Sequence, residues 1–208
     1  MKEKSLAIQA GILASAGLTT KIIGFVYRIP MANILGNTGN GIYSVAFGIY
    51  GIVLTLSSYS MPISVSKLVS EKAAVGSKED SIKVFRVAML VSVIVGALAA
   101  MGLYFGADGL AGVYNKTGLE MPLKVLAPTT FIVSVLGCFR GYFQGYGNMV
   151  PTALSQIIEQ IINAVVSIIA AGQITVLIIG SNNEAALRAM GGTMGTCAGA
   201  MAALVCVM

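Results

Sequence analysis

The sequence contains no histidine and no tryptophan, and it has only three cysteines. Histidine is a common general base and metal ligand, so its absence removes the usual basis for acid–base or metal chemistry. Cys138, Cys197 and Cys206 lie in apolar segments at spacings that match no metal or redox motif, which is typical of small packing residues. No nucleophile–base pair or phosphate-cradling loop is present either. We therefore predict that the chain is not an enzyme and uses no metal or cofactor.

Charged residues are scarce as well. They make up 10% of the 208 residues, whereas 56% are hydrophobic, and the mean hydropathy is +0.86. A soluble domain of this size needs far more charge to cover its surface. No charged side chain occurs between Arg28 and Lys67, between Arg86 and Asp108, or after Arg188. Each gap can hold a spanning helix of about 20 residues, so the composition predicts an all-α protein that crosses the membrane several times.

Six spans are predicted from the apolar runs and the turn residues between them. They are expected at residues 5–27, 42–61, 87–107, 123–142, 151–172 and 189–208. Turns are expected at 35–41 and 180–183, and the charged segment 64–86 is expected to be a solvated cytoplasmic loop. The chain is still apolar at Met208, so we expect it to be the first lobe, or most of it, of a longer protein.

The basic residues predict the orientation of these spans. With the amino terminus in the cytoplasm, the cytoplasmic segments hold Lys2, Lys4, Lys67, Lys72, Lys78, Lys83, Arg86 and Arg140, and the external ones hold Lys116, Lys124 and Arg188. This excess follows the positive-inside rule. The same excess accounts for the net charge of +5, because basic residues near the anionic cytoplasmic leaflet are attracted to it. A nucleic-acid partner is therefore not needed to explain the charge.

Two cations lie within or at the end of the first predicted span. A charge at the centre of a span costs about 2.5–3.5 kcal/mol on insertion scales, so such residues normally face a protein interior or a wet cavity. Lys21 and Arg28 are nearly two helical turns apart, so they project from one face, about 10 Å apart along the axis. Two cations on one wall suit an anionic group such as a diphosphate. The alternative is that both side chains snorkel to the interface.

The fifth predicted span carries a polar stripe formed by Gln156, Glu159, Gln160 and Asn163. Such a stripe either lines a water-filled route or hydrogen-bonds a neighbouring helix, and we favour the route. Glu159 is suited to a proton or cation site, or to pairing with a basic residue. Arg140, near the inner end of the fourth span, is expected to be an interfacial anchor rather than a ligand.

Small residues recur every four positions in the last predicted span. Gly191, Gly195, Gly199 and Ala203 form a face that permits close helix approach. The favoured interpretation is packing against a neighbouring helix, and the alternative is a flexible gating helix.

Several stretches together resemble a known family. They are Arg140-Gly141-Tyr142-Phe143-Gln144-Gly145, then Asn148-Met149-Val150-Pro151-Thr152-Ala153, then Ser155-Gln156 and Glu159-Gln160, supported by Lys21-Ile22-Ile23-Gly24-Phe25 with Arg28. In these residues the chain resembles the stage V sporulation protein B branch of the polysaccharide biosynthesis proteins. That branch belongs to the multidrug/oligosaccharidyl-lipid/polysaccharide exporter superfamily, which also holds the lipid II flippases.

The resemblance implies two lobes of helices around a central cavity, usually with fourteen spans in all. It implies alternating-access transport of undecaprenyl-diphosphate-linked sugars across a bacterial cell membrane, with membrane lipids, the sugar-carrying lipid and a second lobe as partners. Lipid II flippases carry cavity arginines on the first helix. Here Lys21 stands at the first matching position, and Arg28 lies one residue later than the pattern puts it. The resemblance would make Lys21, Arg28 and the polar stripe the substrate-binding residues.

Two other functions fit the sequence less well. A cation-coupled multidrug antiporter of the same superfamily would need a cavity dominated by acidic and aromatic groups. An inactive, truncated membrane bundle would point its polar stripe into helix–helix contacts and would have no polar cavity.

Overall fold

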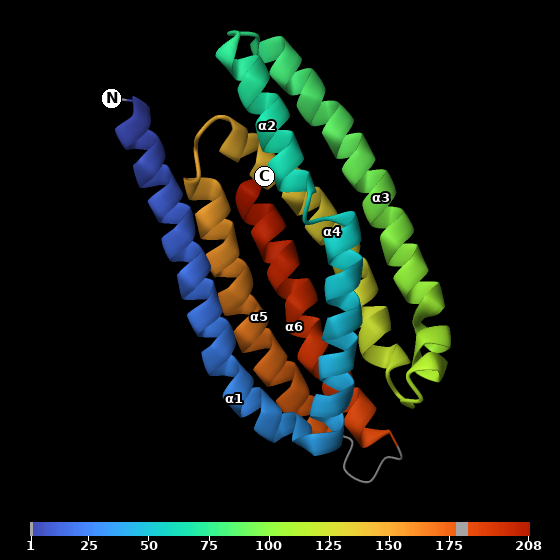
Figure 1. The fold of residues 1–208 in the computed structure, drawn as a ribbon. Coiled ribbons are helices and arrows are strands. Elements are labelled where there is room, and N and C mark those ends of the chain that lie inside the picture. Colours follow the sequence, from blue (N-terminus) through green and yellow to red (C-terminus); the bar gives the residue numbers. More distant parts are fainter. Residues whose placement is uncertain (1, 178–182) are drawn as a thin grey trace.

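The computed structural model describes residues 2–177 and 183–208, with side chains from residue 7 onward. Within these residues every regular element is a helix (Figure 1). The helices are α1 (Lys2–Ser57), α2 (Met61–Ala74), α3 (Lys78–Val113), α4 (Glu120–Gly145), α5 (Val150–Leu177) and α6 (Glu184–Val207). The predicted all-α class is therefore confirmed. Most of the turn predicted at 180–183 lies outside the described residues.

Helix α1 reverses direction at a single residue. Gly36 has φ 65° and ψ 178°, a left-handed backbone conformation that side chains with a Cβ rarely adopt, and the chain is helical on both sides of it. The first arm of α1 runs from the amino terminus to this kink, and the second arm runs back from it, diverging from the first arm (Figure 1). The turn predicted at 35–41 is thus a sharp kink, and the first helix continues past Pro30 to reach it.

The helices cross the molecule in alternating directions. Five described stretches are long and apolar enough to span a membrane, and the first of them, Ala7–Ala74, is divided by Gly36 into two passes. Both chain ends lie toward the same end of the molecule (Figure 1). The lengths, composition and course of the helices confirm a polytopic membrane protein.

The loop predicted at residues 64–86 is wrong. This segment is helical except for a turn at 75–77, and it forms the α2–α3 hairpin. Val65 and Val69, one helical turn apart, are buried, so α2 has an apolar face despite its charges. Ser77 caps α3 by accepting a hydrogen bond from the backbone N–H of Asp80 at 3.3 Å. The charges therefore lie on the exposed faces of helices rather than in a loop.

Glycines allow two pairs of helices to pack with their backbones close together. Helix α6 packs between α5 and α4. A Cβ at Gly199 would lie 2.5 Å from the carbonyl oxygen of Glu159, and one at Gly191 would lie 3.0 Å from the Cα of Ala171. The small face of α6 is therefore a packing surface against α5, as the favoured interpretation predicted.

A second glycine series, which the sequence analysis missed, lies on α4. Gly137, Gly141 and Gly145 face α2, and a Cβ at Gly145 would lie 2.7 Å from the Cβ of Val69. The four-residue spacing is the same as on α6, and it is the signal that could have revealed this contact. This contact also explains why α2 is helical, because its buried valines pack against the glycines of α4.

We predict that Gly199→Ala lowers the melting temperature of the purified chain, because the new methyl group meets backbone and overpacking costs about 1–3 kcal/mol. Gly172→Ala on α5 is the matched control, because a Cβ there meets nothing within 4 Å. The control should leave the stability unchanged or raise it by up to about 1 kcal/mol, because alanine lowers the conformational entropy of the unfolded chain. Thermal melts followed by circular dichroism in detergent would test this. Equal melting temperatures for both variants would contradict the close packing of α5 and α6.

Candidate functional site

A cavity of about 480 Å³ lies between the two arms of α1 and helix α5. It is lined by Lys21, Gly24, Phe25, Tyr27, Arg28, Tyr43, Phe47, Gln160 and Asn163. Four of the seven residues singled out from the sequence, Lys21, Arg28, Gln160 and Asn163, meet in this one cavity. The kink at Gly36 contributes to this arrangement, because it turns the chain back so that both arms of α1 line the cavity.

Lys21 and Arg28 stand on the same wall of the cavity, as their spacing on one helix requires. Neither forms an ion pair or a side-chain hydrogen bond with any described residue. Both are exposed because the cavity is partly open. The two positive charges are therefore available to a ligand and are not consumed by the fold.

Aromatic residues of both arms also line the cavity: Tyr27 lies beside Arg28 on the first arm, and Tyr43 and Phe47 lie on the second arm. The hydroxyl groups of Tyr27 and Tyr43 lie 3.3 Å apart and join the two arms of α1, and the ring centroids of Tyr43 and Phe47 are 4.5 Å apart. The sequence analysis missed these three residues. Tyr27 and Tyr43 lie at similar distances in sequence from Gly36, so placing the reversal at that glycine would have brought them face to face.

The polar stripe of α5 is divided between two environments. The amide of Gln160 faces Gly24 of the first arm, where a Cβ would lie 3.1 Å from the Gln160 Nε2 atom. Asn163 borders the cavity, and its Oδ1 also accepts hydrogen bonds from Ser167 at 3.0 Å and from Thr196 of α6 at 3.3 Å. Asn163 therefore both lines the cavity and joins α5 to α6.

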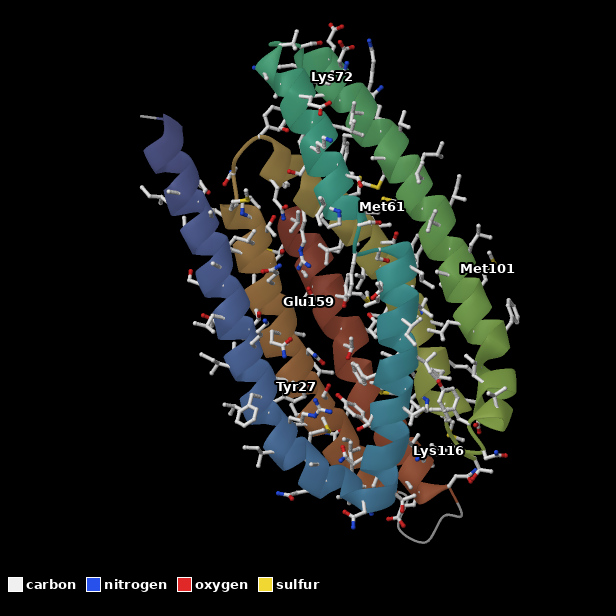
Figure 2. All side chains as sticks on the ribbon, viewed as in Figure 1. Tyr27, Met61, Lys72, Met101, Lys116 and Glu159 are labelled. Atoms are coloured by element: carbon white, nitrogen blue, oxygen red, sulfur yellow. The ribbon has the colours of Figure 1, made fainter. Side chains whose placement is uncertain are left out.

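Glu159 does not line the cavity, because it pairs with Arg140 of α4. The Arg140 Nη2 atom lies 2.8 Å from Glu159 Oε2, and Arg140 Nε donates to Ser155 Oγ at 2.9 Å. The Arg140 side chain is only 13% exposed and that of Glu159 is 25% exposed, and Glu159 lies within the bundle (Figure 2). The structure thus directs Arg140 into the protein, where sequence analysis expected an interfacial anchor. Gln156, one turn before Glu159, has a buried Oε1 atom without a hydrogen-bond partner in the described part of the chain.

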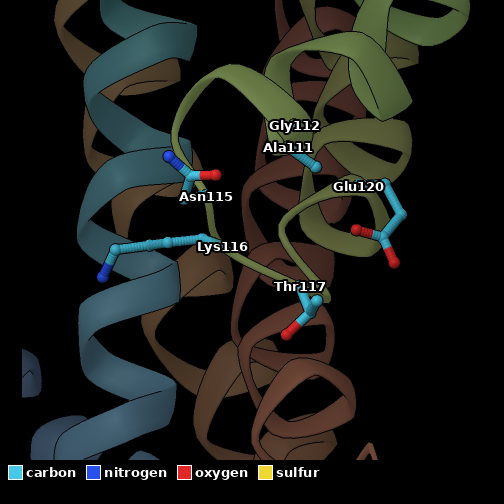
Figure 3. Close-up of a pocket in the computed structure, with 6 residues that line it drawn as sticks. All are labelled: Ala111, Gly112, Asn115, Lys116, Thr117 and Glu120. Carbon is cyan, nitrogen blue, oxygen red and sulfur yellow. The ribbon is translucent and has the colours of Figure 1, made fainter.

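Another hollow, of about 350 Å³, lies at the turn between α3 and α4 (Figure 3). Lys116 extends from this turn toward the second arm of α1, where its Nζ lies 3.4 Å from the position of a Cβ on Gly41. Glu120 borders the same hollow, so a carboxylate accompanies the cation. None of the residues singled out from the sequence lies here, and the cavity beside α5 remains the candidate site.

We predict that either Arg140→Ala or Glu159→Ala destabilises the chain by about 3 kcal/mol, because the remaining charge loses its partner in a mostly buried place. The exchanged double variant, Arg140→Glu with Glu159→Arg, should recover at least half of that loss. Thermal melts of the three proteins in one detergent would measure it. If the double variant melted at the temperature expected from adding two independent losses, no interaction between the two side chains would be supported.

Comparison with known proteins agrees with this architecture. The family model described as "Polysaccharide biosynthesis protein" matches residues 6–208. The chain is similar to stage V sporulation protein B of Bacillus subtilis (strain 168), at 30% identity over 152 residues, which are 73% of this chain and 29% of that protein. It is also similar to the uncharacterized membrane protein YabM of the same organism, at 32% identity over 157 residues, which cover 76% of this chain and 29% of that protein.

A third similar protein is the lipid II flippase MurJ of the same organism, at 29% identity over 163 residues, which cover 74% of this chain and 30% of that protein. The chain spans less than a third of the length of these relatives. No solved structure matches it significantly. Because the family model covers nearly all 208 residues, the chain belongs to the polysaccharide biosynthesis protein family, as a multi-pass protein of the bacterial cell membrane.

Proposed function

We propose that the chain forms part of a flippase that moves a lipid-linked oligosaccharide, built on undecaprenyl diphosphate, across the bacterial membrane by alternating access. The observation that carries this proposal is the cavity in which Lys21 and Arg28, which have no ion-pair partner among the described residues, lie beside the amides of Gln160 and Asn163. The similarity of the chain to a lipid II flippase also supports the proposal.

The cavity has the chemistry that a diphosphate and its sugars need. A guanidinium binds phosphate oxygens through two parallel hydrogen bonds, and an ammonium adds a mobile positive charge with three donors. Arg28 and Lys21 have long side chains that can converge on one diphosphate from positions about 10 Å apart on the helix axis. The amide of Gln160 and the hydroxyl groups of Tyr27 and Tyr43 can bond to sugar hydroxyls. Transport breaks no covalent bond, so no catalytic residue is proposed.

The ion pair of Glu159 argues against the antiporter alternative. A carrier of cationic drugs needs a carboxylate in its cavity, but Glu159 is engaged by Arg140 and no other carboxylate lines the described cavity. An inert bundle is also disfavoured, because two unpaired cations within a span have an insertion cost that packing alone does not offset. An anionic substrate provides that compensation.

A complete transporter requires more than this chain. The chain corresponds to 29–30% of the length of its curated relatives, and alternating access needs a second surface that closes over the cavity. We propose that a second lobe of the same protein provides that surface, and that lipid-linked sugar enters between the lobes from the surrounding membrane lipids.

The proposed orientation puts the amino terminus and the α2–α3 hairpin in the cytoplasm. Lys72 in the hairpin and Lys116 in the α3–α4 turn lie at opposite ends of the molecule (Figure 2). Helix α3 has 36 residues, about 54 Å, whereas the hydrocarbon core is about 30 Å thick. Its charged first turns therefore extend beyond the hydrocarbon, at the end that holds most of the basic residues.

We predict that the double variant Lys21→Ala with Arg28→Ala binds undecaprenyl diphosphate at least tenfold more weakly than the unaltered chain. Each lost charge-assisted contact is worth about 1.5–3 kcal/mol, so a tenfold loss is the lower bound. Native mass spectrometry or a fluorescent-lipid titration on the purified chain would measure it. In the longer protein that contains this chain, the same variant should abolish flipping in proteoliposomes.

The matched control is Lys67→Ala with Lys72→Ala, which removes two cations from the exposed hairpin and leaves the cavity intact. It should bind the diphosphate lipid within about twofold of the unaltered chain. Equal losses of affinity in both double variants would mean that lipid binding depends only on net charge. The cavity would then have no assigned role.

The orientation can be tested with single cysteines in a cysteine-free background. Val75→Cys, at a position 83% exposed at the tip of the hairpin, should react with a membrane-impermeant maleimide only after the cells are permeabilised. Thr117→Cys, in the exposed α3–α4 turn, should react in intact cells. The reverse labelling pattern would place the amino terminus outside and reject the proposed topology.

A further inference from the structure

Asn163 is buried although it borders the cavity that Lys21 and Arg28 line, and only 8% of its surface is exposed. The oxygen of a side-chain amide accepts hydrogen bonds, and its nitrogen donates them. An amide nitrogen turned toward an anionic group attracts that group, whereas an amide oxygen repels it. The orientation of this one amide therefore decides how Asn163 acts on an anion in the cavity.

The hydrogen bonds of Asn163 define that orientation. Its Oδ1 atom accepts from Thr196 Oγ1 of α6 at 3.3 Å and from Ser167 Oγ of α5 at 3.0 Å. Its Nδ2 atom donates to none of the described residues, yet it is not one of the enclosed polar atoms that lack a partner. Nδ2 therefore has open surface, and the cavity is the space that Asn163 borders. The amide turns a donor toward the cavity and its oxygen toward the helices.

Of the two hydroxyl groups, that of Thr196 decides the orientation. A hydroxyl group has one proton to donate. Ser167 Oγ also donates to the carbonyl oxygen of Gly192 at 2.7 Å, so its proton is shared between two acceptors. Thr196 Oγ1 donates to Asn163 Oδ1 alone among the described residues. If the amide turned over, the Thr196 proton would lose its acceptor in a half-buried place, which costs free energy.

Glycines of α6 bring Thr196 within reach of Asn163. A Cβ at Gly195 would overlap the carbonyl oxygen of Asn163, and one at Gly199 would lie 3.2 Å from the Asn163 Cβ. The backbone of α6 therefore contacts α5 just before and just after Thr196 in the sequence. This close packing fixes the register between the two helices, so the Thr196 hydroxyl stays beside the amide oxygen.

We propose that Thr196 is a positioning residue of the cavity. Its hydroxyl holds the amide of Asn163 so that Nδ2 donates a hydrogen bond to an oxygen of the cargo diphosphate, while Thr196 itself is not among the residues that line the cavity. Ionised diphosphate oxygens only accept hydrogen bonds, so they require this donor. The inference rests on the proposed function, because it takes a diphosphate as the ligand.

Thr196→Val tests this role, because it keeps the shape of the side chain and removes its proton. The proton of Ser167 then goes to Gly192, so the lone pairs of Ser167 face the amide. The amide turns over, Nδ2 donates to Ser167, and Oδ1 faces the diphosphate. We expect undecaprenyl diphosphate to bind at least about tenfold more weakly, because a hydrogen bond to a charged group is lost and an oxygen opposes that group.

Two matched variants serve as controls. Thr196→Ser keeps a hydroxyl group at the position and should bind the lipid within about twofold of the unaltered chain. Thr193→Val makes the same change one turn earlier on α6, where the Thr193 hydroxyl donates to the carbonyl oxygen of Met190 in its own helix at 2.7 Å. It should also bind within about twofold. Circular dichroism in the same detergent shows that each variant is folded.

A double-mutant cycle shows whether Thr196 acts through Asn163. Thr196→Val is made in the unaltered chain and in the Asn163→Ala background, and titrations of the full chain with undecaprenyl diphosphate measure all four proteins. In the Asn163→Ala background the valine change should alter the affinity by less than about twofold, because no amide remains to be turned.

A second readout does not depend on affinity. In the ¹⁵N-asparagine-labelled chain with bound undecaprenyl diphosphate, phosphorus-dependent dephasing should be strong for the Nδ2 signal of Asn163, which is assigned by its loss in Asn163→Gln. In Thr196→Val this dephasing should be absent, because Nδ2 then faces Ser167. Strong dephasing that persists in Thr196→Val would overturn the proposal.

The same titration includes the double variant Lys21→Ala with Arg28→Ala, so that two failures can be told apart. If that variant loses affinity but Thr196→Val does not, the proposed function stands and the positioning role of Thr196 is rejected. Equal losses from Thr196→Val with and without the Asn163 amide would also reject that role, since Thr196 would then act only on helix packing. If neither variant loses affinity, the diphosphate is not the ligand, and the proposed function fails together with this inference.

Discussion

The cost of holding charge within a hydrocarbon layer determines how this chain is built. Of the charged residues within its spans, Arg140 and Glu159 neutralise each other across α4 and α5 at 2.8 Å. Lys21 and Arg28 have no protein partner among the described residues and border a cavity instead. The first arrangement holds the bundle together, and the second leaves positive charge to be compensated from outside. The anionic substrate proposed for that cavity would supply this compensation.

Close backbone packing makes the cavity possible. Without a large hydrophobic driving force between helices in lipid, association depends on van der Waals contact at small residues. Gly191 and Gly199 fix α6 against α5, and Gly141 and Gly145 fix α2 against α4. The kink at Gly36 then places the second arm of α1 across the cavity.

The class of the fold was predictable because the membrane imposes strong rules on composition. The scarcity of charge predicted an all-α polytopic protein, and the position of Lys21 relative to Arg28 predicted a shared face. The sequence could not show that residues 64–86 are helical, because their charges hide the buried pair Val65 and Val69. It also could not show that Arg140 pairs with Glu159, since partners on different helices depend on tertiary register. Tyr43 was missed for the same reason, because its place beside Tyr27 depends on the reversal at Gly36.

The central claim is that the cations of the first arm contact the diphosphate of the cargo lipid. Solid-state nuclear magnetic resonance can measure it directly, by phosphorus-dependent dephasing of lysine Nζ signals in the ¹⁵N-lysine-labelled chain with bound undecaprenyl diphosphate. The account predicts strong dephasing of one lysine signal, assigned to Lys21 by its loss in Lys21→Arg, and none for the hairpin lysines. Dephasing confined to Lys67 and Lys72, with Lys21 unaffected, would contradict it.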